Sequence, residues 1–284
     1  MFIWWYLAGS GVNDMKKVSI IVRTCGRPGI LRQCLKSIKE QDYPDIETVV
    51  VEDGRARSKR MIEAEYPDMN IRYMATGSKV GRAAAGNIAL KEAVGDYLNF
   101  LDDDDEFFPD HVSTLVRALE GNSCRAAYTV AQEDVCLFNR RKQKFTRIYK
   151  KIRFNEDFNR LYLLHTNYFP IQSVMFERNL FEEMGGFREN VDCLEDWDLW
   201  VRYASVTDFL KVDKVTSAYK VILSFKRDLN LRKAYKTVNE YFSEYSYSWD
   251  LGTCQDELNS MIKSKFTSKF RRMLYRVGKK IIRN

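Results

Sequence analysis

Apolar runs of strand length alternate with helix-like segments through the first hundred residues of the chain. Residues 18–22 (VSIIV) form the kind of apolar run expected in a strand buried on both faces. Apolar residues between 30 and 38 then recur at the spacing of one helix face. Further strands are expected at 46–51, 71–74 and 97–101, with helices at 59–66 and 82–94 between them. This alternation predicts a mostly parallel α/β sheet flanked by helices, with right-handed crossovers.

Three regions are expected along the chain. Residues 1–14 form an apolar N-terminal extension, which is shorter than the ~20 residues needed to span a bilayer. Residues 15–225 form the α/β domain, and residues 226–284 form a helical C-terminal region ending in a basic amphipathic helix. Within the domain we expect helices near 115–119, 176–184 and 195–204, a strand at 126–130, and a basic hairpin or loop over 140–153.

The excess of basic residues is concentrated at the end of the chain. Residues 261–284 carry nine Lys or Arg and no acid, which leaves 37 basic and 39 acidic residues before them. A domain-wide nucleic-acid surface is therefore disfavoured, and no zinc-finger or RRM pattern is present. The apolar residues of this tail recur at helical spacing, as in a helix lying in the plane of a membrane. We expect it to bind an anionic membrane surface; the alternative is a helix that packs on the domain.

Four consecutive aspartates, at 102–105, follow the strand expected at 97–101. Two like charges at ~4 Å repel by about 4 kcal/mol at an effective dielectric near 20, so a divalent cation would relieve the cluster. Gly95 is interpreted as the cap of the preceding helix, which places the acids at the carboxyl end of a strand, where open α/β sheets bind ligands. The alternative is an acidic, solvated loop.

The usual glycine-rich phosphate loops are absent from the sequence. Gly81 opens a GxxxxG spacing, but Asn87 stands where a P-loop requires Lys, and no GxGxxG opens the first helix. If the protein binds a nucleotide diphosphate, the aspartate run is therefore expected to hold it through a metal ion. A sugar nucleotidyltransferase remains an alternative enzyme class, although residues 23–29 lack the Gly-rich, Lys-bearing loop of that class.

Four segments together resemble the inverting family 2 glycosyltransferases, which have the GT-A fold, a Rossmann-like nucleotide-diphospho-sugar transferase fold. They are VSIIVRTCGRP at 18–28, TVVVEDG at 48–54, GDYLNFLDDDDEFFPDH at 95–111 and MGGFRENVDCLEDWDLWVR at 184–202. The resemblance covers roughly the first 220 residues and not the tail. It implies transfer of a sugar from a UDP-, GDP- or dTDP-sugar donor to a hydroxyl of a saccharide or lipid-linked saccharide, as in surface polysaccharide synthesis.

The resemblance implies a nucleotide site at the ends of the first two strands. In the family, the first strand ends in a turn that holds the nucleobase and ribose, which corresponds to Arg23, Thr24 and Arg27. The acids after the second strand read the base, which corresponds to Glu52 and Asp53. Taken alone, these residue types are equally typical of turns. The chain also departs from the family, with Cys25-Gly26 where Tyr-Asn is common and Glu52 in place of Asp, so the base remains undetermined.

The DxD motif of the family corresponds to Asp102, Asp103 and Asp104. By the resemblance, Asp104 binds Mg²⁺ or Mn²⁺, while Asp102 or Asp103 lies near the ribose or completes the metal ligands. Asp105, one residue later, is expected to be structural. Arg82 is expected to contact the diphosphate; the alternative is a solvated Arg at a helix start.

An inverting transfer requires a carboxylate that takes the proton from the acceptor hydroxyl. By the resemblance this base is Asp196, in the Glu-Asp pair that precedes a Trp. The alternative is an acidic helix start, where carboxylates favourably meet the helix dipole. His165, upstream of Asn167 and Gln172, is a weaker candidate for the acceptor pocket.

Other features bear on the setting of the protein. Six cysteines without CxxC spacing favour a reducing compartment, so we expect a cytoplasmic protein, peripheral on the inner face of the cell membrane if the tail binds lipid. A non-catalytic saccharide-binding domain of the same fold is the remaining alternative. Such a domain would tolerate Asp196→Asn without loss of function.

Overall fold

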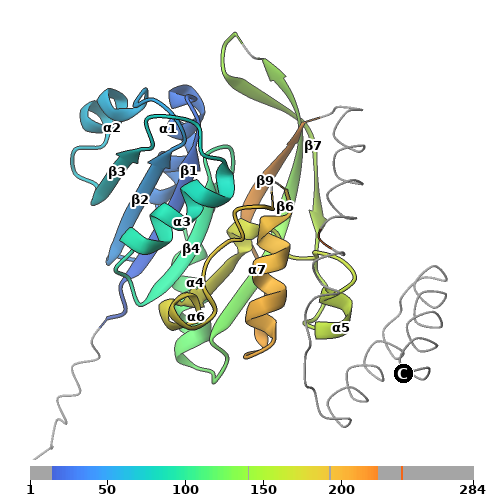
Figure 1. Ribbon diagram of the computed structural model, residues 1–284. Coiled ribbons are helices and arrows are strands. Elements are labelled where there is room, and N and C mark those ends of the chain that lie inside the picture. Colours follow the sequence, from blue (N-terminus) through green and yellow to red (C-terminus); the bar gives the residue numbers. More distant parts are fainter. Residues whose placement is uncertain (1–14, 140, 192, 223–237, 239–284) are drawn as a thin grey trace, which may run out of the picture.

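The computed structural model describes residues 15–139, 141–191, 193–222 and 238 (Figure 1). The predicted extension 1–14 and the basic tail 261–284 lie outside the described residues, as does 226–284 apart from Val238. The helices are α1 (Pro28–Lys39), α2 (Lys59–Glu65), α3 (Arg82–Glu92), α4 (His111–Glu120), α5 (Arg160–Leu163), α6 (Arg178–Met184) and α7 (Glu195–Ala204), with a 3-10 turn, η1 (Ile171–Ser173). The strands are β1 (Val18–Thr24), β2 (Ile46–Glu52), β3 (Ile71–Ala75), β4 (Tyr97–Asp102), β5 (Glu106–Phe107), β6 (Ala126–Asn139), β7 (Lys144–Arg153), β8 (Val174–Glu177) and β9 (Phe209–Ile222).

The strands form one sheet in the order β3-β2-β1-β4-β8-β6-β9-β5, and β7 pairs with β6 outside this path. Strands β3, β2, β1 and β4 are parallel, which confirms the prediction from the alternating pattern. Beyond β4 the sheet is mixed: β8 runs antiparallel to β4 and β6, whereas β9 runs parallel to β6. Figure 1 shows β6 and β7 extending together as a hairpin, as the basic segment 140–153 predicted.

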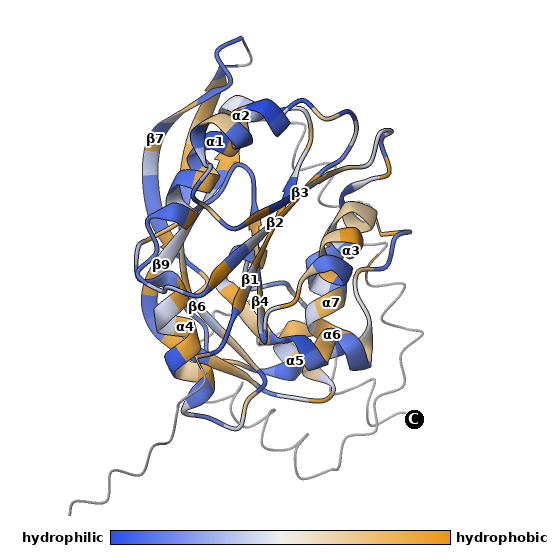
Figure 2. Ribbon diagram, turned by 90° about the vertical axis from the view of Figure 1, so that its left-hand side faces the viewer, coloured by the Kyte–Doolittle hydropathy of each residue, from blue (hydrophilic) through white to orange (hydrophobic). Residues whose placement is uncertain are grey.

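Helices cover both faces of the sheet. Because successive residues of a strand point to opposite faces, Ile20 and Ile21 belong to two different cores. The core that contains Ile20 lies under α1, α2 and α4, and the core that contains Ile21 lies under α3, α5, α6 and α7. Figure 2 shows the two helix layers on either side of the sheet. Trp197 and Trp200 are fully buried in the second core, so both are packing residues.

The structure corrects three local expectations. The helix expected at 176–184 begins at Arg178, because Phe176 belongs to β8 and is buried between strands β4 and β6. Strand β9 was not predicted at all. Gly95 is not a helix cap: a Cβ there would lie 2.6 Å from the backbone nitrogen of Ser19, so glycine permits close approach to β1. Within the described residues, no helix combines the length and apolar character needed to cross a membrane.

The parallel half of the sheet brings the predicted donor residues together. Parallel strands end at the same edge, and the pairing places Thr24 beside Glu52 and Arg23 beside Asp102. The turns that follow β1, β2 and β4 therefore meet at one site, although they are widely separated in sequence. The start of α7 reaches the same edge, since Glu195 contacts Arg23.

Candidate active site

Arg23, at the end of β1, is the central cation of the site. Its side chain is only 6% exposed, and it donates from Nε and Nη2 to both oxygens of Asp102, at 2.8 and 3.0 Å. Its Nη1 donates to Glu195 at 2.8 Å. The buried Glu195 and the partly buried Asp102 thus share one guanidinium. Arg23 and Arg82 hold the pKa of Asp102 below its usual value despite desolvation.

The four aspartates occupy four different environments. Asp103 is buried; it accepts hydrogen bonds from Thr24 at 2.6 Å and from the guanidinium of Arg27. Asp105 is also buried and accepts from the backbone nitrogen of Lys220 at 3.0 Å, and burial raises its pKa well above the usual value. This contact is the structural role expected for Asp105.

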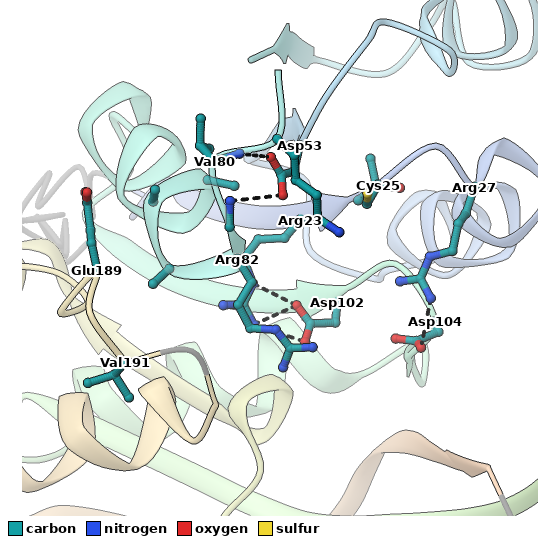
Figure 3. A pocket seen from close by; sticks show the side chains of 16 residues that line it. Arg23, Cys25, Arg27, Asp53, Val80, Arg82, Asp102, Asp104, Glu189 and Val191 are labelled. Atoms are coloured by element: carbon teal, nitrogen blue, oxygen red, sulfur yellow. Dashed lines mark hydrogen bonds and ion pairs between the residues drawn. The ribbon is translucent and has the colours of Figure 1, made fainter. Parts of the chain in front are cut away.

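Asp104 is the carboxylate of the run with the weakest protein contacts. Its Oδ2 lies 3.5 Å from Nη1 of Arg27, and its side chain is 28% exposed. Figure 3 shows Asp104 facing Arg27, while Asp102 lies beside Arg23 and Arg82. The backbone holds Asp104 in place, because its carbonyl oxygen accepts from Lys220 Nζ at 2.6 Å.

The two acids after β2 have separate roles. Glu52 is fully buried and accepts from the backbone nitrogens of Gly26, Arg57 and Ser58, at 2.9–3.0 Å, and from the Tyr73 hydroxyl. Glu52 therefore stabilises the turns after β1 and β2 through their backbone nitrogens and does not face the site.

Asp53 lies at the site itself. It accepts from the backbone nitrogens of Val80 and Gly81, at 2.6 and 3.1 Å. Gly81 has a φ of +98°, a conformation that favours glycine and leads directly into α3. Asp53 thus fixes the segment that presents Arg82.

These residues enclose a first pocket of about 340 Å³, which we call the donor pocket. All the predicted donor residues line it except Glu52 and Asp103, which lie behind its wall in the described structure; those that line it are Arg23, Thr24, Arg27, Asp53, Arg82, Asp102 and Asp104. Most of its polar side chains are cations and carboxylates (Figure 3). Such a lining suits a charged ligand.

Asp196 lies in the first turn of α7. The residue before the helix, Leu194, has a left-handed backbone with φ 62°, a strain that is common at functional sites. Asp196 accepts from Asn167 Nδ2 at 3.0 Å and from its neighbour's backbone nitrogen, on Trp197, at 2.9 Å. Burial, and then repulsion from Glu195, raises the pKa of Asp196 to about 7. A carboxyl group with this pKa is suited to accept a proton near neutral pH.

A second pocket, of about 530 Å³, contains Asp196; we call it the acceptor pocket. Arg82, Asp102 and Asp104 line both pockets, so the two meet at the carboxylates of the aspartate run. His165 is exposed and does not line either pocket of the described structure, whereas Asn167 and Gln172 line the acceptor pocket. A ligand atom bound at these carboxylates would therefore be accessible from both pockets.

The carboxylates at this boundary fit a divalent cation held partly by its substrate. Among the described residues, no group of three or more His, Cys, Asp or Glu side chains could hold a metal ion. Mg²⁺ commonly takes one or two protein carboxylates and completes its ligands with phosphate oxygens and water. Asp104, with Asp102 beside it, supplies a donor set of this kind.

Two groups of site residues escaped the sequence analysis. Glu195 was treated only as a helix-start acid, yet it pairs with Arg23 and lies 3.8 Å from Arg82. The far wall of the acceptor pocket comes from β6, β7 and β9 and includes Glu133, Arg153, Tyr219 and Lys220. Glu195 was missed because its pairing with Arg23, 172 positions away, leaves no local signal in the sequence. The far wall was missed because strand β9 was not predicted.

A family model described as Glycosyl transferase family 2 matches residues 19–185, more than half of the chain. The chain belongs to glycosyl transferase family 2. The match ends before α7, so the segment that bears Asp196 lies outside it.

Several similar proteins are named as glycosyltransferases. An uncharacterized glycosyltransferase of Bacillus subtilis is 29% identical over 189 residues, covering 66% of this chain and 68% of the relative. A GalNAc(5)-diNAcBac-PP-undecaprenol beta-1,3-glucosyltransferase of Campylobacter jejuni is 35% identical over 111 residues, covering 38% of this chain and 36% of the relative. The chain spans only about a third of two Rickettsia relatives, 33% and 34% of their lengths.

Solved structures share the GT-A-type fold of this family 2 chain. Staphylococcus aureus TarS 1-349 in complex with UDP-GlcNAc has a TM-score of 0.60 at 15% identity, covering 91% of this chain and 70% of that one. The mannosyltransferase PcManGT from Pyrobaculum calidifontis, in complex with GDP-Man and Mn²⁺, has a TM-score of 0.56 at 18% identity, covering 95% and 81%. At these identities the likeness establishes the fold alone.

Proposed function

We propose that this family 2 chain is a metal-dependent inverting glycosyltransferase that moves a sugar from a nucleotide-diphosphate sugar to a hydroxyl of a saccharide or lipid-linked saccharide. The observation that carries the proposal is the meeting of the two pockets at Arg82, Asp102 and Asp104, with Asp196 in the second one. The UDP-, UDP-GlcNAc- and GDP-Man-bound relatives support a nucleotide-sugar donor. The undecaprenol-linked and teichoic acid substrates in the names of relatives support a role in surface polysaccharide synthesis.

Each residue has a defined task in this reaction. Thr24, Arg27 and Asp53 line the end of the donor pocket that holds the nucleoside. Arg82 neutralises the negative charge of the diphosphate. Asp196 accepts the proton of the attacking hydroxyl from the acceptor side, opposite the departing diphosphate. A Mg²⁺ or Mn²⁺ ion on Asp104 and Asp102 would stabilise the negative charge of the nucleoside diphosphate leaving group.

Thermal unfolding with UDP, GDP and dTDP, each with and without Mn²⁺, tests the donor site. We expect one nucleotide to stabilise the protein by about 2.7 kcal/mol at ~100 times its Kd, and Mn²⁺ to increase the shift. Asp104→Asn should remove the increment due to Mn²⁺, because an amide is a weaker metal ligand than a carboxylate. Glu106→Gln is the matched control, since Glu106 is a nearby exposed acid outside both pockets.

Two outcomes of that experiment would count against the proposal. Failure of all three nucleotides to shift the melting temperature would favour a non-catalytic saccharide-binding domain. A nucleotide-induced shift in melting temperature that is equal with and without Mn²⁺ would reject the assignment of Asp104 as a metal ligand. The configuration of the product at its anomeric carbon, measured by NMR, separately tests inversion.

The C-terminal tail, residues 261–284, is proposed to hold the enzyme at an anionic membrane surface. Each basic residue near such a surface contributes about 1 kcal/mol, and the tail has nine. We expect the full chain to sediment with phosphatidylglycerol vesicles and the chain without 261–284 to remain in the supernatant. Phosphatidylcholine vesicles are the uncharged control. Equal sedimentation of both proteins would refute a membrane role for the tail.

A further inference from the structure

Two carboxamide side chains line the acceptor pocket with polar atoms that have no partner among the described residues. They are Asn167, whose Oδ1 is unpaired, and Gln172, whose Nε2 and Oε1 are both unpaired. The Gln172 side chain is fully buried. Leaving a buried donor or acceptor unpaired costs about 1–3 kcal/mol, so such atoms in a pocket wall point to a ligand that pairs with them.

Asn167 is oriented by its contact with the proposed base. Its Nδ2 donates to Asp196 Oδ2 at 3.0 Å. The opposite atom, Oδ1, is therefore the carbonyl oxygen and can only accept a hydrogen bond. A hydroxyl that donates to this oxygen lies next to the carboxylate that takes the proton of the attacking hydroxyl.

Gln172 stands on a rigid support. Its backbone carbonyl, in η1, accepts from Asn99 Nδ2 at 3.2 Å, and Asn99 Oδ1 lies 2.9 Å from His111 Nε2. His111 Nδ1 in turn lies 2.7 Å from Thr216 Oγ1. Burial lowers the pKa of His111 to about 3, so the ring is neutral and the network keeps one arrangement near neutral pH. The wall that carries the Gln172 amide is thus fixed before any ligand binds.

Two cations of the same pocket are engaged by other groups, and the third, Arg82, lies at the boundary with the donor pocket. Arg153 donates to Glu133 at 3.0 Å, and Lys220 donates to the Asp104 carbonyl at 2.6 Å. Phe154 and Phe169 add apolar surface to the lining. The unpaired atoms are then two carbonyl oxygens and one amide nitrogen. This set matches neutral hydroxyl groups, which both donate and accept, whereas an ionised phosphate or carboxylate would place negative charge against the two carbonyl oxygens.

We propose that Asn167 and Gln172 form the subsite for the acceptor sugar, where their free amide atoms bind adjacent hydroxyl groups of a neutral saccharide. Asn167 also acts as a positioning residue for Asp196. The identification of the ligand as the acceptor sugar rests on the proposed transfer reaction. The subsite itself is defined by the two amides and the pocket.

The test uses two small probes, trans-1,2-cyclohexanediol and cyclohexanol, which differ by one hydroxyl. Binding to the full-length protein is measured by saturation-transfer NMR titration. We expect the diol to bind about fivefold more tightly for each additional hydrogen bond that it makes. Gln172→Leu and Asn167→Leu should each reduce this preference by about fivefold, and inorganic phosphate should not displace the diol.

Thermal stability separates a binding role from a packing role. Gln172→Leu removes a buried unpaired amide and keeps most of the volume, so the melting temperature should stay equal or rise. Ser217→Ala is the control, because its hydroxyl is also buried and unpaired but lies outside both pockets. This control should leave the diol preference unchanged.

Several results would overturn the inference. These are equal affinity of the parent protein for the two probes, an unchanged diol preference in both variants, or competition by phosphate. A lower melting temperature of Gln172→Leu with the diol preference intact would assign Gln172 to packing and reject the subsite. Nucleotide binding is measured separately, so loss of every nucleotide shift with a retained diol preference would reject the proposed transfer and leave the amide subsite standing.

Discussion

Asp196→Asn is expected to lower the turnover number by about 10²–10⁴-fold, the contribution typical of a positioned general base. The amide has nearly the same shape but cannot take the proton of the acceptor hydroxyl. The donor pocket does not include Asp196, so the thermal shift with nucleotide should be unchanged. Melting temperature should not fall either, because the neutral side chain ends the repulsion from Glu195.

The pH dependence of the parent enzyme provides a second measure of the same residue. The pKa of Asp196 is raised to about 7, so the carboxylate forms as the pH rises through this value. Turnover should therefore increase with pH across this range and decline below it. Asp213→Asn is the control, since Asp213 is exposed on β9 and outside both pockets. Retained turnover in Asp196→Asn, with a normal pH profile, would reject the assignment.

Arg23→Met is expected to destabilise the fold by about 3–5 kcal/mol, because it removes the main counter-charge of the buried Glu195 and of the partly buried Asp102, and leaves only the more distant Arg82 beside them. Arg23 is 6% exposed and Glu195 is 3% exposed, so water cannot replace the lost contacts. Asp102 would lose both of its hydrogen bonds from the guanidinium. Nucleotide binding should disappear together with the stability, since Asp102 lines the donor pocket.

The matched control for this substitution is Arg32→Met. Arg32 also donates twice to one carboxylate, Glu65, but both side chains are largely exposed. Exposed pairs contribute little because water and salt screen them. Urea unfolding of both variants measures the difference. Equal stability changes would show that the buried pairs of Arg23 are not what stabilises the site.

The sequence predicted the parallel half of the sheet well because its strands are buried on both faces. Continuous apolar runs such as β1 and β4 are clear signals, and the turns at their ends follow from topology. Strand β9 carries no such run, since its residues alternate between buried, partly exposed and exposed positions with several Lys among them. Residues 209–222 form a strand because they pair with β6, and such a tertiary contact cannot be predicted from the local sequence pattern.

Residue types within the site were easier to predict than their orientation. Asp102, Asp103 and Asp104 are chemically equal in the sequence, yet Asp102 pairs with Arg23, Asp103 is buried against Thr24, and Asp104 has only a long contact with Arg27. Likewise Glu52 and Asp53 are adjacent acids, but only Asp53 faces the donor pocket. Asp102 and Glu52 are the last residues of their strands, whereas Asp103, Asp104 and Asp53 lie in the turns that follow. The direction of each side chain is therefore set by the turn and its tertiary contacts, which the local sequence does not reveal.

The Arg23–Glu195 contact also bears on how the protein is made. It joins residues 172 positions apart, so during synthesis the first strands leave the ribosome long before their counter-charge exists. Contacts of such long range form late and slow the folding of a chain. Until α7 docks, Arg23 lacks its contact with Glu195 and the site lacks Asp196. A chain cut short before α7 would lack Glu195 and the proposed base Asp196, so we expect no transfer activity until synthesis has passed this helix.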